Sequence, residues 1–251
     1  MKTINSAIEW QLTLKNFGPR SIGFVPTMGA LHAGHAALLE RCRAENDISV
    51  LSIFVNPTQF DNKEDLQKYP VTYAEDCKIA EQAGVDYIFL PNYKELYPDN
   101  YRYRVSENSF SQTLCGAHRP GHFDGVLTVV MKLLNIIDAD RAYFGEKDYQ
   151  QLNLVQGMVE AFFMKVEIVP CATRRENDGL AMSSRNRRLS PIDRERSVLF
   201  AQLLKSSESP PAIRDELNKA GFEVDYIEDI GGRRFGAVKI GGVRLIDNVE
   251  R

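Results

Sequence analysis

The sequence lacks paired cysteines. Its four cysteines, Cys42, Cys77, Cys115 and Cys171, are scattered and form no C-x-x-C pair. This spacing argues against a zinc site and against a disulfide framework, and we predict no metal ligands in the chain. Because free thiols persist in reducing compartments, we expect a cytoplasmic protein.

Long apolar runs and an excess of positive charge are also missing. No run approaches the roughly 20 apolar residues that a membrane-spanning helix needs. Glu9 and Gln11 interrupt the N-terminal segment where a secretory signal would be apolar. The 31 Lys and Arg residues face 34 Asp and Glu residues, which gives a net charge of −3. We therefore expect neither a membrane nor a nucleic acid as a partner, although a local basic pocket is compatible with this balance.

The chain has instead an alternation of short apolar runs with helical patterns, and this predicts its fold class. The apolar runs predict strands over residues 21–25, 48–55, 85–90, 141–144 and 165–171. Helical spacing predicts helices over residues 3–16, 34–46, 72–83, 121–138 and from 149 onward. Strands that alternate with helices in this way predict a doubly wound, Rossmann-like α/β domain with a parallel sheet.

Two local patterns refine this prediction. The run from Thr72 to Glu75 has the form of a capping box, which would open the third helix. Residues 92–120 are polar and less regular, and we expect a long excursion there that contains short strands.

The composition changes at the polar stretch 174–179, which we take as a domain boundary. We expect a Rossmann-like domain over residues 1–173 and a smaller α+β domain over residues 174–251. Serine followed by proline predicts helix starts at 190 and 209. The alternating tail, with glycine pairs at 231–232 and 241–242, predicts three antiparallel strands joined by tight turns.

The stretch from Phe24 to His35 is predicted to be a strand, a glycine loop and the start of a helix. Free N–H groups at a helix start favour phosphate, and small residues let phosphate approach the backbone. His32 and His35 stand where the helix begins, and imidazoles can donate to a developing charge. We expect a nucleotide triphosphate site here. The alternative is a tight connection whose histidines lie on the surface.

Polar clusters follow two further strands, at residues 56–59 and 145–151. Ligands of open α/β sheets bind outside the carboxyl ends of the strands, so one composite site is expected. The amides of Asn56 and Gln59 suit a small neutral or hydroxylated substrate, unless they form a simple Asn-Pro turn. Lys147 beside Asp148 could bridge phosphates or could be an exposed ion pair. We expect one of the two glutamines at 150 and 151 to face the pocket.

Two later motifs also carry polar side chains. Ser183, Ser184 and Arg185 lie on a short loop that could hold phosphate oxygens and close over a nucleotide, or could be a basic linker. His118 and His122 lie in the run from Gly116 to Gly125. We expect these two histidines to shape a turn and a helix cap rather than to take part directly in chemistry.

Together these motifs resemble the pantothenate synthetases (pantoate–β-alanine ligases) of the H-x-G-H nucleotidylyltransferase superfamily. H-x-G-H alone would be a weak signal, but five motifs in this order are specific. The matching runs are Pro26–His35, Phe54–Phe60, Arg119–Val126, Phe144–Gln151 and Asp178–Asn186.

The resemblance implies the roles of individual residues. Residues implied to contact ATP are Met28, Gly29, Ala30, Leu31, His32, Ala33, Gly34, His35, Gly145, Glu146, Lys147, Asp148, Arg174, Met182, Ser183, Ser184 and Arg185. Those implied to be catalytic are His35 as proton donor, with His32, Lys147, Ser183, Ser184 and Arg185. Those implied to hold pantoate are Asn56, Gln59 and Gln151.

The activity implied by the resemblance is the ATP-dependent condensation of (R)-pantoate with β-alanine. Pantothenate, AMP and pyrophosphate would form through a pantoyl-adenylate intermediate, with Mg²⁺ accompanying ATP, in a homodimer joined by its N-terminal domains. Two departures from the family pattern stand out. Arg174 stands where the family tends to have a small apolar residue beside adenine, and the C-terminal domain is expected to be shorter than usual.

Two other functional classes compete with this interpretation. A nucleotidyltransferase acting on a phosphorylated acceptor would need a further basic site, whereas Gln59 and Gln151 are neutral. A non-catalytic ATP-binding module or an RNA-charging relative is the other alternative, and the sequence pI of about 5.9 argues against the second of these.

Overall fold

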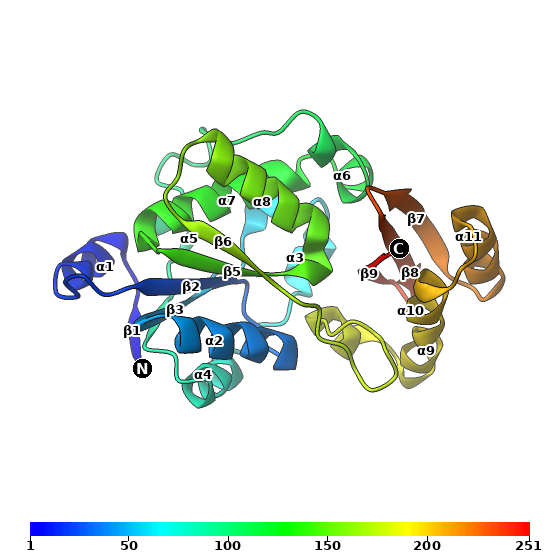
Figure 1. Cartoon of the computed structure of the whole chain (residues 1–251), viewed down its shortest axis with the longest axis horizontal. Coiled ribbons are helices and arrows are strands. Elements are labelled where there is room, and N and C mark those ends of the chain that lie inside the picture. The colour runs from blue at the N-terminus through cyan, green and yellow to red at the C-terminus, as the bar shows by residue number, and fades with distance from the viewer.

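The computed structural model describes all residues from Met1 to Arg251 and contains two sheets with helices around them (Figure 1). The strands are β1 (Lys2–Ile4), β2 (Ile22–Thr27), β3 (Ile48–Ile53), β4 (Tyr87–Phe89), β5 (Arg141–Gly145), β6 (Glu167–Cys171), β7 (Glu223–Ile230), β8 (Arg233–Ile240) and β9 (Val243–Glu250). The α-helices are α1 (Ala7–Leu14), α2 (Ala33–Glu45), α3 (Lys63–Gln67), α4 (Tyr73–Gln82), α5 (Tyr93–Leu96), α6 (Cys115–His118), α7 (His122–Ile137), α8 (Tyr149–Ala161), α9 (Pro191–Arg196), α10 (Val198–Lys205) and α11 (Pro210–Lys219). Short 3₁₀ helices are η1 (Pro57–Gln59), η2 (Phe110–Gln112), η3 (Glu146–Asp148) and η4 (Ser184–Arg188).

The larger sheet is parallel throughout, with the strand order β1-β4-β3-β2-β5-β6. Its central strands are covered on both faces, and Phe24, Val25, Val50 and Leu51 have no exposed surface. This is why β2 and β3 are continuous apolar runs in the sequence. The predicted doubly wound α/β class is confirmed.

The order of strands places a switch point between β2 and β5. From β2 the chain moves outward through β3 to β4, and it then returns to the other side of β2 to form β5. The loops that leave β2 and β5 therefore diverge from one crevice at the carboxyl edge of the sheet. Ligands of such sheets bind at this place.

Helix α7 is the best-buried helix of the larger part, the one built around the parallel sheet. Val126, Val130, Leu133 and Ile137 are at most 5% exposed and belong to the main hydrophobic core. Trp10 of α1 donates its indole N–H to the carbonyl of Ile137, 3.1 Å away, and so ties the N-terminal helix to the end of α7. The helix predicted over 121–138 is confirmed.

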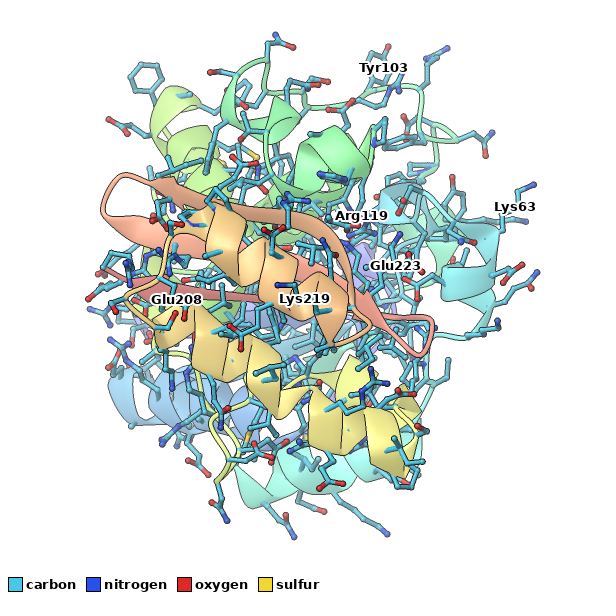
Figure 2. All side chains as sticks on the ribbon, turned by 90° about the vertical axis from the view of Figure 1, so that its right-hand side faces the viewer. Lys63, Tyr103, Arg119, Glu208, Lys219 and Glu223 are labelled. Carbon is cyan, nitrogen blue, oxygen red and sulfur yellow. The ribbon has the colours of Figure 1, made fainter.

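The C-terminal part has helices α9 to α11 and the antiparallel sheet β7-β8-β9, as predicted. The glycine pairs 231–232 and 241–242 all have positive φ, between 56° and 76°, which two-residue hairpin turns require. One face of this sheet packs on α10 and α11, and Tyr226 and Phe235 on the other face join the core of the larger part. Seen from the C-terminal side, Glu208 and Lys219 lie on the outer helical layer (Figure 2).

Three local predictions were wrong in part. The helix predicted over 3–16 is shorter than expected, because Lys2–Ile4 form the edge strand β1, which pairs with β4, and α1 covers only Ala7–Leu14. A strand of three residues is too short to show a period of its own. The excursion 92–120 contains α5, η2 and α6 and no strand. Helix α4 begins at Tyr73, after Thr72, as predicted, but Thr72 makes no side-chain cap bond, and its hydroxyl donates instead to Asp76, 3.1 Å away. No helix combines the length and the apolar content needed to cross a bilayer.

Candidate active site

Two adjoining cavities open at the carboxyl edge of the parallel sheet. The inner one has a volume of about 230 Å³ and the outer one, between the sheet and the C-terminal part, about 470 Å³. The inner cavity is lined by every residue implied to be catalytic and by Met28, Gly34, Asn56, Gln59, Gly145, Asp148, Gln151, Arg174 and Met182. Gln59, Lys147 and Gln151 line both cavities, so the two spaces meet beside them.

Five residues implied to contact ATP line neither cavity, namely Gly29, Ala30, Leu31, Ala33 and Glu146. The N–H groups of Ala30 and Leu31 donate to the buried carboxylate of Asp76, at 3.0 and 2.8 Å. The glycine loop thus turns these donors inward, away from the space a phosphate would fill. The loop therefore supports the start of α2. Sequence reasoning missed Asp76, because Glu75 was read as the polar partner of Thr72.

The two histidines of the H-x-G-H motif are neutral. Burial, then the charges of Lys147 and Arg187, lower the pKa of His32 to about 4. Burial, then His32 and Lys147, lower the pKa of His35 to about 3. The ring centroids of the pair are 4.1 Å apart. At neutral pH each ring is therefore a hydrogen-bond donor through a single N–H, and neither is an imidazolium acid.

The hydrogen bonds of these rings indicate what they can offer a ligand. His32 is the N-cap of α2, and its Nδ1 accepts from the N–H of Gly34 at 3.1 Å. The proton of the neutral His32 ring is therefore on Nε2, in a side chain that lines the inner cavity. His35 Nδ1 is buried and has no partner within the protein. Such an atom is rare in folded proteins, and a water molecule or a ligand in the inner cavity would satisfy it.

The turn that carries Lys147 is held by a residue close to the C-terminus. Asn248 of β9 donates its side-chain amide to the carbonyls of Glu146 and Lys147, both at 2.9 Å. Lys147 itself is paired with Asp148 at 3.7 Å, and its side chain is 18% exposed. Sequence reasoning missed Asn248, since a lone asparagine in a C-terminal strand carries no motif.

The amide cluster after β3 orients one glutamine. Asn56 donates to the Gln59 side-chain oxygen at 3.0 Å and to the carbonyl of Gly125 at 3.1 Å. The Asn56 oxygen also accepts from Tyr97 at 2.9 Å, and Asn56 is only 1% exposed. Asn56 is therefore fully engaged inside the protein and supports Gln59. The free group of Gln59 is its NH₂, a donor suited to carboxylate and hydroxyl oxygens.

Of the neighbouring glutamines, Gln151 is the one at the cavities' junction. Gln150 is buried, and it accepts from the N–H of Cys115 at 3.0 Å while it donates to the carbonyls of Phe110 and Thr113. It organises the excursion before α7. Gln151 lines both cavities. This agrees with the prediction that one of the two glutamines faces the pocket.

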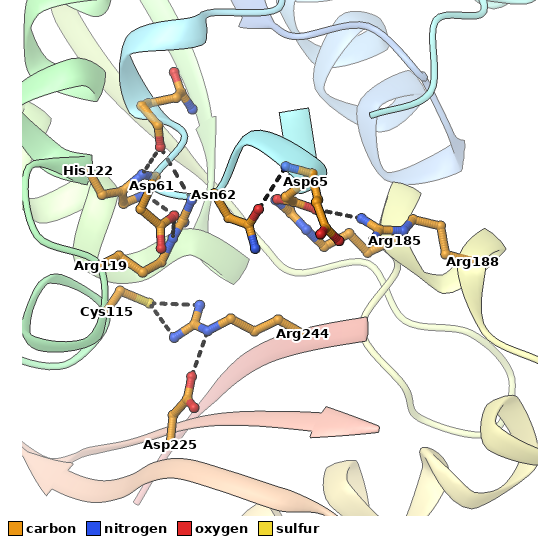
Figure 3. A network of polar contacts seen from close by, with 12 residues as sticks. Asp61, Asn62, Asp65, Cys115, Arg119, His122, Arg185, Arg188, Asp225 and Arg244 are labelled. Atoms are coloured by element: carbon orange, nitrogen blue, oxygen red, sulfur yellow. Dashed lines mark hydrogen bonds and ion pairs between the residues drawn. The ribbon is translucent and has the colours of Figure 1, made fainter. Parts of the chain in front are cut away.

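The loop that carries Ser183, Ser184 and Arg185, the serine-arginine loop, is tied to the larger part by an acidic residue. Arg185 and Arg188 both donate to Asp65 of α3, at 3.1 and 2.6 Å (Figure 3). Burial would raise the pKa of Asp65, but the two guanidinium groups hold it below its usual value. The Ser183 hydroxyl accepts from the N–H of Arg185 at 3.2 Å and caps the turn. Sequence reasoning did not single out Asp65.

The site as a whole joins a donor-rich surface to neutral amides within one crevice. Lys147, Arg185 and the two imidazoles supply hydrogen-bond donors for phosphate oxygens, and Gln59 and Gln151 supply amides for a small polar acid. No group of three or more His, Cys, Asp or Glu side chains is placed to bind a metal ion. On this fold, such a site defines an α/β nucleotide-dependent enzyme of the H-x-G-H type.

Comparison with known proteins identifies the family. The family model described as pantoate-beta-alanine ligase matches residues 1–250, and the chain belongs to this family. A pantothenate synthetase of Bdellovibrio bacteriovorus is 58% identical over 92% of each chain. One of Legionella pneumophila is 53% identical over 99% of each chain. The family condenses pantoate with β-alanine in an ATP-dependent reaction, and the chain is such a ligase.

Solved structures agree with this assignment. The pantoate-beta-alanine ligase of Francisella tularensis, complexed with beta-gamma ATP and beta-alanine, has a TM-score of 0.96 at 39% identity and covers 100% of this chain and 97% of its own. The Thermus thermophilus enzyme has a TM-score of 0.90 at 39% identity, with 100% and 99% covered. These relatives are matched over nearly their full length, so the C-terminal part is not short beside them.

Proposed function

We propose that the inner cavity binds ATP together with pantoate, with His32 and His35 acting as neutral hydrogen-bond donors and Asn56 supporting Gln59. The observation that carries this proposal is the lining of one cavity by His32, His35, Lys147 and Arg185 together with Gln59. Cations and imidazoles suit a triphosphate, while a neutral amide suits a hydroxy acid. The ATP analogue and β-alanine named for the Francisella enzyme support the same ligands here.

In the first step the pantoate carboxylate attacks the α-phosphorus of ATP, and pyrophosphate leaves. Gln59 and Gln151 hold pantoate through their amides, so that the attacking oxygen lies in line with the leaving group. Lys147, Arg185 and the N–H groups of the neutral imidazoles donate to phosphate oxygens as charge moves onto pyrophosphate. Donors prearranged for developing charge are the main means by which such a site lowers a barrier.

In the second step the amine of β-alanine attacks the acyl carbon of the adenylate. A C–N bond forms as the bond between the acyl carbon and the bridging oxygen breaks, AMP leaves with that oxygen on its phosphate, the amine loses a proton to water, and pantothenate results. The outer cavity of about 470 Å³ meets the inner one at Gln59 and Gln151, and we propose it as the entry route for β-alanine. Orientation of two reactants in one site contributes roughly 7–11 kcal/mol in favourable cases.

Magnesium is proposed to accompany ATP and not to occupy a cage of protein ligands. The chain supplies cations around the phosphates and no cluster of carboxylates. These residues fit an ion that is bound by phosphate oxygens and water, the usual arrangement of Mg²⁺ with nucleotides. Bound in this way, Mg²⁺ would neutralise phosphate charge.

We also propose the wider organisation that the resemblance implies. Residues 1–173 would form the ATP- and pantoate-binding domain, and residues 174–251 a smaller lid domain whose Met182, Ser183, Ser184 and Arg185 close on the triphosphate. The enzyme would be a homodimer, which light scattering of the purified protein tests. Four free cysteines support a reducing compartment, and so the cytoplasm.

The deciding experiment measures AMP and pyrophosphate with each substrate omitted in turn. Pyrophosphate release is expected to require pantoate but not β-alanine, and sustained AMP formation to require both. Pyrophosphate released with a phosphorylated acceptor in place of pantoate would favour a nucleotidyltransferase instead. ATP binding without turnover under any combination would favour a regulatory module.

A further inference from the structure

The turn between α6 and α7 lies directly beside the amide cluster. Its motif, residues 119–125, has so far been given no task in the reaction. Figure 3 shows Arg119 and His122 next to Asp61, and both side chains reach the carbonyl of Gln59 in η1. The turn and the first residues of α7 approach Gln59 at three points. These are the Gln59 carbonyl, the Gln59 side-chain oxygen (through Asn56) and the Gln59 α-carbon.

The first contact is to the Gln59 carbonyl. His122 Nδ1 lies 2.7 Å from this oxygen, and Arg119 Nη2 lies 3.3 Å from it. A carbonyl oxygen can only accept, so Nδ1 carries the proton of the His122 ring. Nε2 of the same ring is then free to accept from Arg119 Nη1, 3.1 Å away. One neutral tautomer satisfies both bonds.

Arg119 is itself fixed by a carboxylate. Its Nε donates to Asp61 at 2.8 Å, and the Arg119 side chain is only 14% exposed. Burial, then the adjacent guanidinium of Arg119, lower the pKa of His122 to about 3. The ring therefore stays neutral in the range where the enzyme is assayed. Asp61, Arg119, His122 and Gln59 form one continuous chain of hydrogen bonds.

The remaining contacts come from Gly125. A Cβ at this position would lie 2.4 Å from the Thr58 carbonyl oxygen and 2.7 Å from the Gln59 α-carbon, so only glycine allows α7 to approach η1 this closely. The Gly125 carbonyl accepts from Asn56, which also donates to the Gln59 side-chain oxygen. The start of α7 thereby restrains both the backbone and the side chain of Gln59.

We propose that Arg119 and His122 are positioning residues for Gln59, and through it for the hydroxy acid that is activated in the first step. This inference rests on the proposed function, in which the Gln59 amide holds pantoate. Neither residue touches the reacting atoms. Their effect is to fix the amide to within a fraction of an ångström, where a displacement of about 1 Å costs on the order of 100-fold in rate.

The test compares three variants that separate the hydrogen bonds from the bulk of the side chains. His122→Phe keeps a ring but removes both nitrogens. His122→Asn retains a donor close to the position of Nδ1. Arg119→Met keeps the aliphatic stem and removes the guanidinium. The matched control is His118→Phe, because His118 ends α6 just before this turn, lines the outer cavity but not the inner one where the first step takes place, and makes no hydrogen bond to η1. Gln59→Leu is measured in parallel.

Adenylate formation is followed as pantoate-dependent pyrophosphate release, with KM determined for pantoate and for ATP and Tm recorded for every variant. His122→Phe and Arg119→Met are expected to lower kcat/KM for pantoate by about 10- to 100-fold. The KM for ATP is expected to stay near the wild-type value. His122→Asn should recover most of the loss, and His118→Phe should behave as wild type.

Two results would overturn the inference. The first is a wild-type kcat/KM for pantoate in both His122→Phe and Arg119→Met while Gln59→Leu is impaired. The second is an equal rise in the KM for ATP and for pantoate, with a lowered Tm that His122→Asn does not restore, since this would show a purely structural role. If Gln59→Leu itself keeps wild-type pantoate kinetics, the proposed function fails, and this inference fails with it.

Discussion

At the scale of single residues, the proposed chemistry of this site uses imidazoles that are kept neutral by burial and by neighbouring cations. His32 and His35 have pKa values of about 4 and about 3 because burial and Lys147 disfavour the imidazolium form. They can therefore donate to phosphate oxygens without adding two more charges to a crowded cationic surface. Lys147 supplies the charge, and its place depends on the turn that Asn248 holds.

Removing one of these donors should impair the first step most. His35→Ala or Lys147→Ala is expected to lower the rate of adenylate formation by roughly 100-fold, the effect of losing one prearranged donor in a site of this kind. Single-turnover pyrophosphate release with saturating pantoate measures it. Rates that remained near wild type in both variants would contradict the proposed roles.

The same pKa values predict how stability depends on pH. The unfolded chain binds protons on its histidines near pH 6.5, whereas the folded chain resists them at His32, His35 and His122 until about pH 4 or about pH 3. Acidification below pH 6.5 therefore favours unfolding, by up to about 1.4 kcal/mol per pH unit for each such histidine.

Urea unfolding of the nucleotide-free enzyme between about pH 7.5 and 5 measures this dependence. His35→Asn should lose stability less steeply on acidification than the wild type, since one resisting site is gone. Carboxylates contribute equally to both proteins and cancel in the comparison. An unchanged slope would contradict the burial of a neutral His35.

At the scale of elements, short segments are held in place by buried or half-buried carboxylates. Asp76 of α4 accepts from the N–H groups of Ala30 and Leu31 and so sets the path of the glycine loop. Asp65 of α3 binds Arg185 and Arg188 of η4. If Arg185 is to contact a triphosphate, it must exchange Asp65 for phosphate oxygens, while Arg188 can keep its bond.

Removing the charge of Asp65 should ease this exchange. Asp65→Asn is expected to lower the KM for ATP by about two- to fivefold, the scale of one partly exposed ion pair. The neighbouring Glu64→Gln is the matched control, because Glu64 is 75% exposed and pairs only with Lys68. A raised KM for ATP in Asp65→Asn would show that Asp65 orders the loop for binding and does not compete with ATP.

At the scale of the whole molecule, buried polar contacts hold the C-terminal sheet to the segment that precedes it and to the domain of the parallel sheet. Arg175 binds both oxygens of Asp247, at 2.6 and 3.0 Å, and the Asp247 side chain is 1% exposed. Arg244 donates to Asp225 at 2.7 Å and lies 3.6 Å from the Cys115 sulfur (Figure 3). Asn248, next to Asp247 on β9, donates to the carbonyls of Glu146 and Lys147 and so seats β9 against the turn that carries Lys147.

Breaking the buried pair should therefore be costly. Asp247→Ala is expected to lower the free energy of unfolding by about 3–5 kcal/mol, because it leaves Arg175 without its partner. The control is Glu250→Ala on the same strand, whose carboxylate is 84% exposed beside Arg233 and should contribute less than about 1 kcal/mol. Chemical denaturation measures both, and similar losses in the two variants would contradict this ranking.

The sequence by itself determined the fold class, most element positions and the motifs that line the inner cavity. Apolar runs such as 48–53 and the helical spacing of α7 are local signals, because the spacing of apolar residues within an element shows which of its faces are buried. The five motifs identified the family for the same reason: each is a contiguous run. Among the site residues, His32, His35, Lys147, Gln59 and Gln151 were all found in this way.

Only the tertiary structure decided which of the motif residues face the cavity and what holds them there. Asp76 beneath the glycine loop, Asp65 of α3, which binds Arg185, and Asn248, which holds the turn of Lys147, are single polar residues far along the chain from their partners. The pairing of His122 with Gln59 is likewise non-local. A hydrogen bond between distant segments produces no hydrophobic period and no motif spacing in the sequence. Only packing of the whole chain brings the donor and the acceptor together.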